Sequence, residues 1–565
     1  MKKATDLKRN IQAIDHRGYP GYKELRGEYD FGDFLLSIDH VQGDPFASPS
    51  HLSVMVEGQK AGFPKELFHT VPNRITLQDH LTRLFGKALA PYHFKAKGSG
   101  KSGLLEISHC GQQVLERTAC CVKPDGSVIV RFEAGFPANG RSINGGELIK
   151  MLFQYIPEAV NASLFFAKIN HNALQKAIFL CEDQQYIRNQ LEPMGLCAFL
   201  AEGSVLPRES GISDRPMKHA TAFVSPDSMK VTLTLPHRGK ISGMGIPKGI
   251  TLFVGGGYHG KSTLLQALEM GVYNHIPGDG RELVITDSSA WKLRAEDGRS
   301  ISQVDISPFI NHLPNKKDTV HFSTEDASGS TSQAANLMEG IESGSTLFLI
   351  DEDTSATNFM IRDELMQKVI CREEEPITPF IERVKSMYQD LGISSVIVAG
   401  SSGSFFQIAD TVIQMREYIP YDITDKAKNA SADYPALSLQ ENFPSTGTER
   451  TPKPNTALKK EQRLKMKTMG THEILLAKDS IELRYLEQLI DNEQTNSLAY
   501  ALKYMELHLM DGQKTIPKLL DEIEELMAKK GLEALFDKEY VRSSLAAPRR
   551  QELAGCINRY RKLYF

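Results

Sequence analysis

The amino-acid sequence predicts an α/β fold with a mostly parallel sheet in residues 216–420, and three observations support this. Short β-branched runs alternate with helical patterns there, as in GITLFVGGG followed by STLLQALEMGVY, which is typical of a parallel sheet. A glycine-rich loop joins that first strand to its helix. Two acids directly follow another apolar run, in TLFLIDED.

Regions of different composition flank this core. Residues 1–215 mix strand and helix patterns and predict an α+β N-terminal domain that is a candidate for nucleic-acid binding; a PDG turn joins two of its strands into a hairpin. Residues 421–470 are polar, basic and proline-containing, which predicts a linker. Residues 471–565 show helical periodicity and predict a mainly helical C-terminal region.

Composition narrows the class of protein. The chain has 565 residues, 41% hydrophobic and 24% charged, with a net charge of −4; this is typical of a multidomain globular protein and excludes a uniformly basic nucleic-acid coat. No apolar run of 18 residues and no secretory signal pattern is present, and the seven cysteines lack C-x-x-C spacing. We therefore expect a cytoplasmic protein with reduced thiols and no membrane contact.

The glycine-rich loop GGGYHGKST fits the pattern G-x-x-x-x-G-K-[ST] between a strand and a helix. Glycines let backbone N–H groups point at phosphate oxygens, and the following helix presents its N-terminus to the anion. Lys261 would neutralise the β- and γ-phosphates, and Ser262 would bind Mg²⁺. The loop predicts ATP as ligand and Mg²⁺ as cofactor, bound by Gly255, Gly256, Gly257, Tyr258, His259, Gly260, Lys261, Ser262 and Thr263.

The acidic pair that follows the strand TLFLI predicts hydrolysis rather than phosphoryl transfer to a small molecule. Asp351 would hold Mg²⁺ through water, and Glu352 would position and polarise the attacking water as the catalytic residue.

Between these two motifs lies ASGSTSQAANL, residues 327–337. It resembles the Ser-Gly-Gly-Gln signature of the ATP-binding cassette (ABC) ATPases, with Ser330 at the position of the second glycine. We expect Gln333 to begin a helix whose N-terminus offers amides and hydroxyls to a γ-phosphate. The resemblance implies that this phosphate belongs to the ATP of a second copy, and hence a homodimer; its contacts would be Ser328, Gly329, Ser330 and Gln333.

Other ABC elements can be placed by the same resemblance. The D-loop falls on SATN, with Ser355 and Asn358, and the Q-loop residue is Gln303 or Asp305. The switch histidine of ABC proteins has no counterpart after SSVIVAG, where Gly400 or Ser401 stands instead.

Two rings are weak candidates for contact with the base. His237 is the nearest ring before the phosphate loop in the sequence, although one ring does not make a stacking platform. Trp291, the only tryptophan, is better explained by a place in the core or an interface.

Six stretches spread over most of the chain, among them RGEYDFGDFLLSIDHVQGDPFASPS, VDISPFI and LIDEDTSATNFMIRD, together resemble the soluble family called predicted ATPases of the ABC class. The resemblance implies a P-loop NTPase with an ABC-type head, its own N-terminal domain and a C-terminal extension. It also implies no transmembrane partner and a role in RNA-associated complexes.

Basic clusters are the candidate nucleic-acid surface, because lysines and arginines contact phosphates and interleaved tyrosines can stack on bases. An exposed charge run, or ordinary helix packing at the C-terminus, explains the same residues. The candidates are Lys459, Lys460, Arg463, Lys465, Lys467, Arg549, Arg550, Arg559 and Arg561.

These motifs favour an ATP-hydrolysing homodimer whose closure is coupled to RNA binding or RNA processing. Because the switch histidine is missing, a nucleotide-gated nucleic-acid-binding module with negligible turnover is the alternative. A P-loop kinase or transferase would account for Lys261 and Asp351 but not for the SGSTSQ segment.

Overall fold

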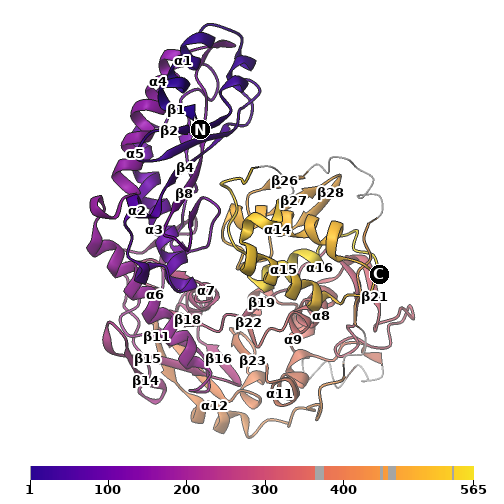
Figure 1. Cartoon of the computed structure of the whole chain (residues 1–565). Coiled ribbons are helices and arrows are strands. Elements are labelled where there is room, and N and C mark those ends of the chain that lie inside the picture. Colours follow the sequence, from indigo (N-terminus) through magenta and orange to yellow (C-terminus); the bar gives the residue numbers. More distant parts are fainter. Residues whose placement is uncertain (1, 363–368, 370–373, 446–448, 456–465, 537–539) are drawn as a thin grey trace. The chain divides into compact units, whose positions relative to one another are not determined.

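The computed structural model describes residues 2–362, 369, 374–445, 449–455, 466–536 and 540–565. The chain forms two compact units (Figure 1): Met1–Glu182 with Leu532–Ala547, and Asp183–Gly531 with Pro548–Phe565. The boundary lies inside helix α6 (His171–Leu191) and not near residue 215, where we expected the N-terminal domain to end. The reason is that residues 183–215 supply a strand and polar contacts to the second unit, where the side chain of Gln184 donates to the carbonyls of His275 and Glu282.

The first unit is an α+β structure around one mainly antiparallel sheet, as expected for the N-terminal part. Its strand order is β1-β2-β3-β4-β8-β5, with β7 also paired to β8. The strands are β1 (Lys2–Lys3), β2 (Gly27–Asp30), β3 (Leu35–His40), β4 (Ser50–Val56), β5 (Leu105–Glu106), β7 (Cys120–Val122) and β8 (Val128–Ala134). The helices of eight or more residues within it are α1 (Ala4–Ile14), α3 (Val71–Leu89) and α5 (Ile156–Ser163). The β7–β8 pairing confirms the hairpin predicted around the PDG turn.

The second unit contains the predicted parallel sheet. Its order is β19-β22-β23-β16-β24-β25, and every neighbouring pair is parallel except β24–β25. The strands are β16 (Ile250–Val254), β19 (Trp291–Leu293), β22 (Leu347–Asp351), β23 (Ser394–Val398), β24 (Thr411–Arg416) and β25 (Ile419–Asp422). All five residues of β22 and of β23 are buried, which explains why, apart from Asp351 at the end of β22, these strands consist of apolar or small residues.

A second, antiparallel sheet in the same unit has the order β14-β15-β11-β18. It contains β11 (Leu196–Ala201), β14 (Lys230–Leu235), β15 (Gly239–Pro247) and β18 (Val284–Thr286). Strand β15 leads directly into β16, so this sheet precedes the strand that carries the glycine-rich loop.

The C-terminal region is mainly helical, as predicted. A small sheet of β26 (Met466–Met469), β27 (Glu473–Leu476) and β28 (Asp479–Glu482) precedes α14 (Asn492–Tyr504), α15 (Ile516–Lys530) and α16 (Arg550–Asn558). Part of the expected 421–470 linker is folded into the unit: it forms α12 (Thr424–Ser431), and Arg450 is 6% exposed. Within the described residues, no helix is long and apolar enough to cross a membrane.

Candidate nucleotide site

The phosphate loop and the acidic pair meet at one edge of the parallel sheet. Val398 of β23 pairs with Phe253 of β16 on one side and with Asp351 of β22 on the other. With strands about 4.8 Å apart, Asp351 lies about 10 Å from Phe253, across one intervening strand. Since these strands are parallel, the segments that leave their carboxyl ends come together, and they carry the loop, the acids and the switch position.

Backbone geometry at the phosphate loop requires glycine at two positions. Gly255 has φ +140°, and a Cβ there would lie 2.4 Å from the carbonyl oxygen of Met415. Gly260 has φ +93° and caps α7 (Lys261–Met270). Tyr258, between them, also has a positive φ and is fully exposed. The glycines and the tight turn into α7 form the cradle that phosphate oxygens fit.

Lys261 and Ser262 begin α7. In this structure the Lys261 ammonium donates to the carbonyl oxygens of Gly255, at 2.6 Å, and Gly256, at 2.9 Å. Ser262 is exposed on the first turn, and His259 accepts from the backbone N–H of Glu417 at 2.9 Å. A hydroxyl and a carboxylate are hard oxygen donors, so the donor types of Ser262 and Asp351 suit Mg²⁺.

Asp351 ends β22 and is 7% exposed, and its carboxylate accepts a hydrogen bond from the N–H of Asp353. Glu352, the expected catalytic residue, is bound by the segment that follows β23. Its Oε2 accepts from the N–H groups of Gly400 (2.6 Å) and Ser401 (3.0 Å), and its Oε1 accepts from the Ser401 hydroxyl at 2.6 Å. Burial alone would raise the pKa of Glu352, but the hydrogen bonds from Ser401, Gly400 and Ser402 outweigh it and lower the pKa. The two switch candidates therefore contact the catalytic candidate itself.

The signature segment is a helix N-terminus, but the helix begins earlier than expected. Helix α8 spans Gly329–Glu342 with Ser328 as its N-cap residue, so Gln333 is inside the helix and the expectation that it starts there was wrong. Ser328 is exposed and Ser330 is 9% exposed. The first turn, and not Gln333, presents free amides.

Gln333 instead joins α8 to the D-loop. It is fully buried, donates to the Ser355 hydroxyl at 3.0 Å and accepts from the N–H of Ala356 at 2.7 Å. Ser355 in turn donates to the carbonyl of Asp351 at 2.8 Å, and Asn358 is exposed. The signature helix, the D-loop and the acidic pair are thus one hydrogen-bonded assembly.

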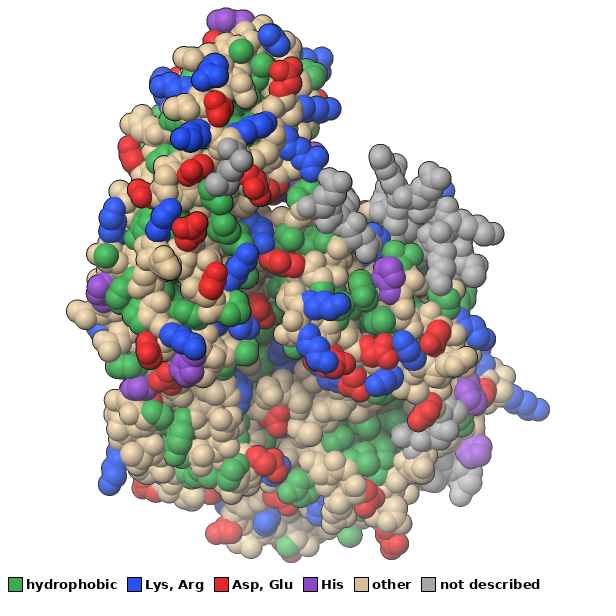
Figure 2. Space-filling view, viewed as in Figure 1, with side chains coloured by type: hydrophobic (Ala, Val, Ile, Leu, Met, Phe, Trp, Pro, Cys, Tyr) green, Lys and Arg blue, Asp and Glu red, His purple; other side chains and the backbone are tan. Residues whose placement is uncertain are grey.

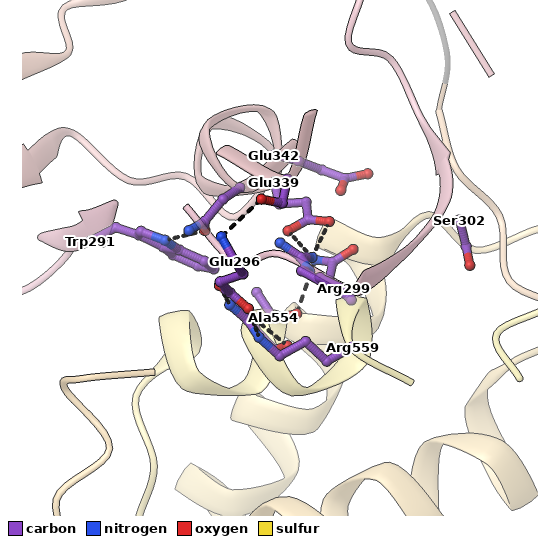
Figure 3. A network of polar contacts seen from close by, with 12 residues as sticks. Trp291, Glu296, Arg299, Ser302, Glu339, Glu342, Ala554 and Arg559 are labelled. Carbon is purple, nitrogen blue, oxygen red and sulfur yellow. Dashed lines mark hydrogen bonds and ion pairs between the residues drawn. The ribbon is translucent and has the colours of Figure 1, made fainter. Parts of the chain in front are cut away.

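Behind the signature helix lies a buried network of charges (Figure 3). Arg299 binds Glu339, Arg450 binds Glu342, and Arg559, directly after α16, binds Glu296. Trp291 donates to Asn336 of α8 at 2.9 Å, which confirms it as a core residue. Figure 3 shows Arg299 and Arg559 between the helix that carries Glu339 (α8) and the helix that carries Ala554 (α16), and these two helices contact each other.

This network corrects several nucleic-acid candidates. The side chains of Arg559 and Arg549 are only 3% and 12% exposed and are paired with Glu296 and Glu552, so neither is free to contact a phosphate backbone. Arg550 is paired with Asp521 and Glu524. A basic helix that packs on buried acids has the same sequence pattern as one that binds phosphates, and only the tertiary partner distinguishes them.

The remaining basic candidates differ in exposure, and some lie outside the described residues. Arg561 pairs with Glu325 but is about half exposed, and Lys467 is exposed on β26. Lys459, Lys460, Arg463 and Lys465 lie outside the described residues. On the face shown in Figure 2, basic and acidic side chains are interspersed and do not form one continuous basic surface.

The two Q-loop candidates differ in their local bonding. Gln303 has φ +56°, and its N–H donates to the Ser323 hydroxyl at 2.9 Å. The Asp305 carboxylate accepts from the N–H and hydroxyl of Ser307. The choice between them stays a prediction.

A cavity of about 340 Å³ lies beside the phosphate loop, and the sequence did not predict it. Its walls are mostly apolar or aromatic: Leu206, Pro207, Met217, His219, Ala220, Thr221, Phe223, Gly260, Thr263, Met415 and Tyr418. His237, the ring considered from sequence, is not among them. The wall comes from a loop some forty residues before the phosphate loop and from β24–β25, and no local pattern signals that these segments meet. An apolar cavity next to a phosphate cradle suits a nucleobase.

Comparison with known proteins places these features in a family. Three family models match in succession: the N-terminal domain of ATPases of the ABC class over residues 4–167, the P-loop domain of ABC ATPases over 170–450, and the MRB1590 C-terminal domain over 465–565.

The uncharacterized protein MJ1628 of Methanocaldococcus jannaschii is 32% identical over 229 residues, which is 39% of this chain and 50% of that protein. The chain thus spans half the length of this curated relative. Among solved structures, the ADP conformation of MJ1267, an ATP-binding cassette of an ABC transporter, is 12% identical with a TM-score of 0.23, covering 35% of this chain and 89% of that one. The structure of cbiO1 from Clostridium perfringens, part of the ABC transporter complex cbiONQ, is 15% identical with a TM-score of 0.24, covering 40% of this chain and 87% of that one.

The three family models together follow nearly the whole chain, and the P-loop domain model spans β16, α8 and β22. This chain belongs to the ATPases of the ABC class that carry their own N-terminal and C-terminal domains.

Proposed function

We propose that the protein binds and hydrolyses ATP at sites shared between two copies of the chain, and that closure of this homodimer is coupled to RNA binding or processing. One observation carries the proposal. A single sheet edge brings together the phosphate loop and the acidic pair, while Gln333 bonds the signature helix to the segment directly after those acids.

The residues have separate tasks in this reaction. Lys261 and the amides at the start of α7 bind the phosphates. Ser262 and Asp351 would hold Mg²⁺, which neutralises charge on the phosphates when bound. Glu352 orients the attacking water and accepts its proton.

The proposal of a shared site rests on the signature helix. Helix α8 has 14 residues, and its capping residue Ser328 is exposed with Gly329 beside it. These amides and hydroxyls would bind the γ-phosphate of ATP held by Lys261 of a second copy.

Support for RNA comes from the basic residues between 453 and 467, of which Lys467 is exposed on β26. Salt should weaken such a complex strongly, because phosphate contacts release counterions. Steady-state phosphate release should therefore be measured with RNA, with DNA and without ligand, each at two salt concentrations. Stimulation by RNA that fades with salt supports the coupling; equal rates in all conditions would remove RNA from the proposal.

The dimer is tested by Glu352→Gln, which should retain ATP and form a dimer on gel filtration only when ATP and Mg²⁺ are present. Glu441→Gln, at an exposed glutamate that is not part of the candidate site, is the matched control and should behave like the wild-type chain. A Glu352→Gln chain that binds ATP but stays monomeric would exclude the shared site.

The alternative, a nucleotide-gated module with negligible turnover, is favoured by the hydrogen bonds that engage Glu352 and by the missing switch histidine. Tight ATP retention without phosphate release, with or without RNA, would favour this alternative.

A further inference from the structure

The segment Gly400–Ser402 presents an unusual set of donors at the nucleotide edge of the sheet. It leaves the carboxyl end of β23, the strand that separates the acid-bearing β22 from the loop-bearing β16. Two consecutive N–H groups and one hydroxyl of this segment converge on one carboxylate, that of Glu352, at 2.6 to 3.0 Å. Converging backbone amides of this kind bind anions in general, whether carboxylate or phosphate.

These contacts also occupy most of the hydrogen-bond acceptor positions of the Glu352 carboxylate. Oε2 accepts two N–H groups and Oε1 accepts the Ser401 hydroxyl. A carboxylate has about four acceptor positions, so three of them are filled by this segment. These three bonds leave about one acceptor position, on Oε1, for a water molecule, and they make the carboxylate a weaker base; an oxygen that leaves these donors accepts a proton from water more readily.

We propose that Gly400–Ser402 is an anion latch: its donors hold either the Glu352 carboxylate or the γ-phosphate of the nucleotide, one at a time. Arrival of the γ-phosphate then releases Glu352 to act on water, so that the base becomes available only when a triphosphate is in place. Ser401 is the positioning residue of this latch, because its hydroxyl is the side-chain donor to Glu352. The latch rests on the nucleotide site proposed above, but not on turnover.

The latch predicts competition between two anions, which equilibrium binding can measure without hydrolysis. The probes are Mg²⁺ with a non-hydrolysable ATP analogue, and Mg²⁺ with ADP, which lacks the γ-phosphate. Glu352→Ala should raise the affinity for the triphosphate analogue about tenfold, the value of one hydrogen bond to a charged group, and leave ADP affinity unchanged.

Simple repulsion between Glu352 and the γ-phosphate would give the same first result, and a double-mutant cycle separates the two explanations. Ser401→Ala weakens the hold on Glu352, so the effect of Glu352→Ala should shrink severalfold in that background. Ser401→Thr keeps a hydroxyl and should restore the full effect. An effect of Glu352→Ala that is equal with Ser401 and with Ala at this position would overturn the latch.

Phosphate release by the same proteins keeps this inference separate from the proposed function. Coupling between Ser401 and Glu352 in analogue binding, without phosphate release from any variant, would retain the latch and overturn hydrolysis. Phosphate release by the wild-type chain without such coupling would retain hydrolysis and overturn the latch. Thermal unfolding of each variant checks that the exposed Ser401 side chain can be replaced without loss of the fold.

Discussion

The two halves of the nucleotide site are built in opposite ways. The phosphate loop is shaped by backbone: glycines with positive φ, an exposed Tyr258, and a lysine hydrogen-bonded to carbonyls of its own loop. The signature helix is held by buried side chains. Gln333 bonds the D-loop, Arg299 and Arg450 pair with Glu339 and Glu342 of the helix, and Arg559 pairs with Glu296. Substitutions on the loop side should therefore affect ligand binding, and substitutions on the helix side should affect stability and the attachment of the C-terminal region.

The largest effect should come from Arg559→Met. It leaves Glu296 buried without its ion-pair partner, which costs about 3–5 kcal/mol of unfolding free energy. Urea unfolding followed by the fluorescence of Trp291, which is bonded to the signature helix, measures this loss. The matched control is Arg561→Met, whose half-exposed pair with Glu325 should be worth less than about 1 kcal/mol. Equal losses in the two variants would contradict the buried network.

Lys261→Met tests the other half of the comparison. It should reduce nucleotide affinity about 100-fold, through loss of two charge-assisted hydrogen bonds, and leave the unfolding midpoint unchanged. Titration with a fluorescent ATP analogue and a thermal melt are the two measurements. The exposed Lys240→Met on β15 is the control and should bind normally. A large stability loss in Lys261→Met would show that the loop side also depends on buried side chains.

Gln333→Leu should have an effect smaller than that of Arg559→Met or Lys261→Met. It removes two buried hydrogen bonds to the D-loop, at about 1–3 kcal/mol, while the phosphate loop stays intact. We expect near-normal ATP binding by the monomer and weaker ATP-dependent dimer formation, measured by sedimentation at several protein concentrations. Normal dimer formation would show that the D-loop does not need this side chain.

The smallest effect should be a loss of stability in acid. Burial raises the pKa of Glu296, but Arg559 and Arg299 outweigh it and lower the pKa below that of an ordinary glutamate. The folded state then binds fewer protons than the unfolded state, so this contribution is complete above about pH 4.5 and declines as the pH falls through the folded pKa. Urea midpoints from about pH 7 down to about pH 3, which is below the ordinary pKa of a glutamate, measure it. The double variant Glu296→Gln/Arg559→Met should lose less stability with acid than the wild-type chain; an identical pH dependence would contradict the assignment to this pair.

The candidate site was predictable where it depends on local backbone. The phosphate loop needs glycines at 255 and 260 and a lysine at the start of α7, and the acids need a buried strand that ends at 351. Each of these requirements is met by a short stretch of consecutive residues, so the sequence pattern predicts it. The start of α8 was misjudged because the side chain of Gln333 bonds within the tertiary structure and is not used at the helix N-terminus.

The sequence by itself determined the class of fold, the phosphate loop, the acidic pair and the location of the signature segment, because each is specified by neighbours in the chain. Only the tertiary structure decided which arginines are buried, where the two compact units divide, which loops line the cavity beside Gly260, and that Ser401 bonds Glu352. These features depend on partners tens to hundreds of residues apart, such as Glu296 and Arg559, and the composition of either segment alone does not reveal its partner.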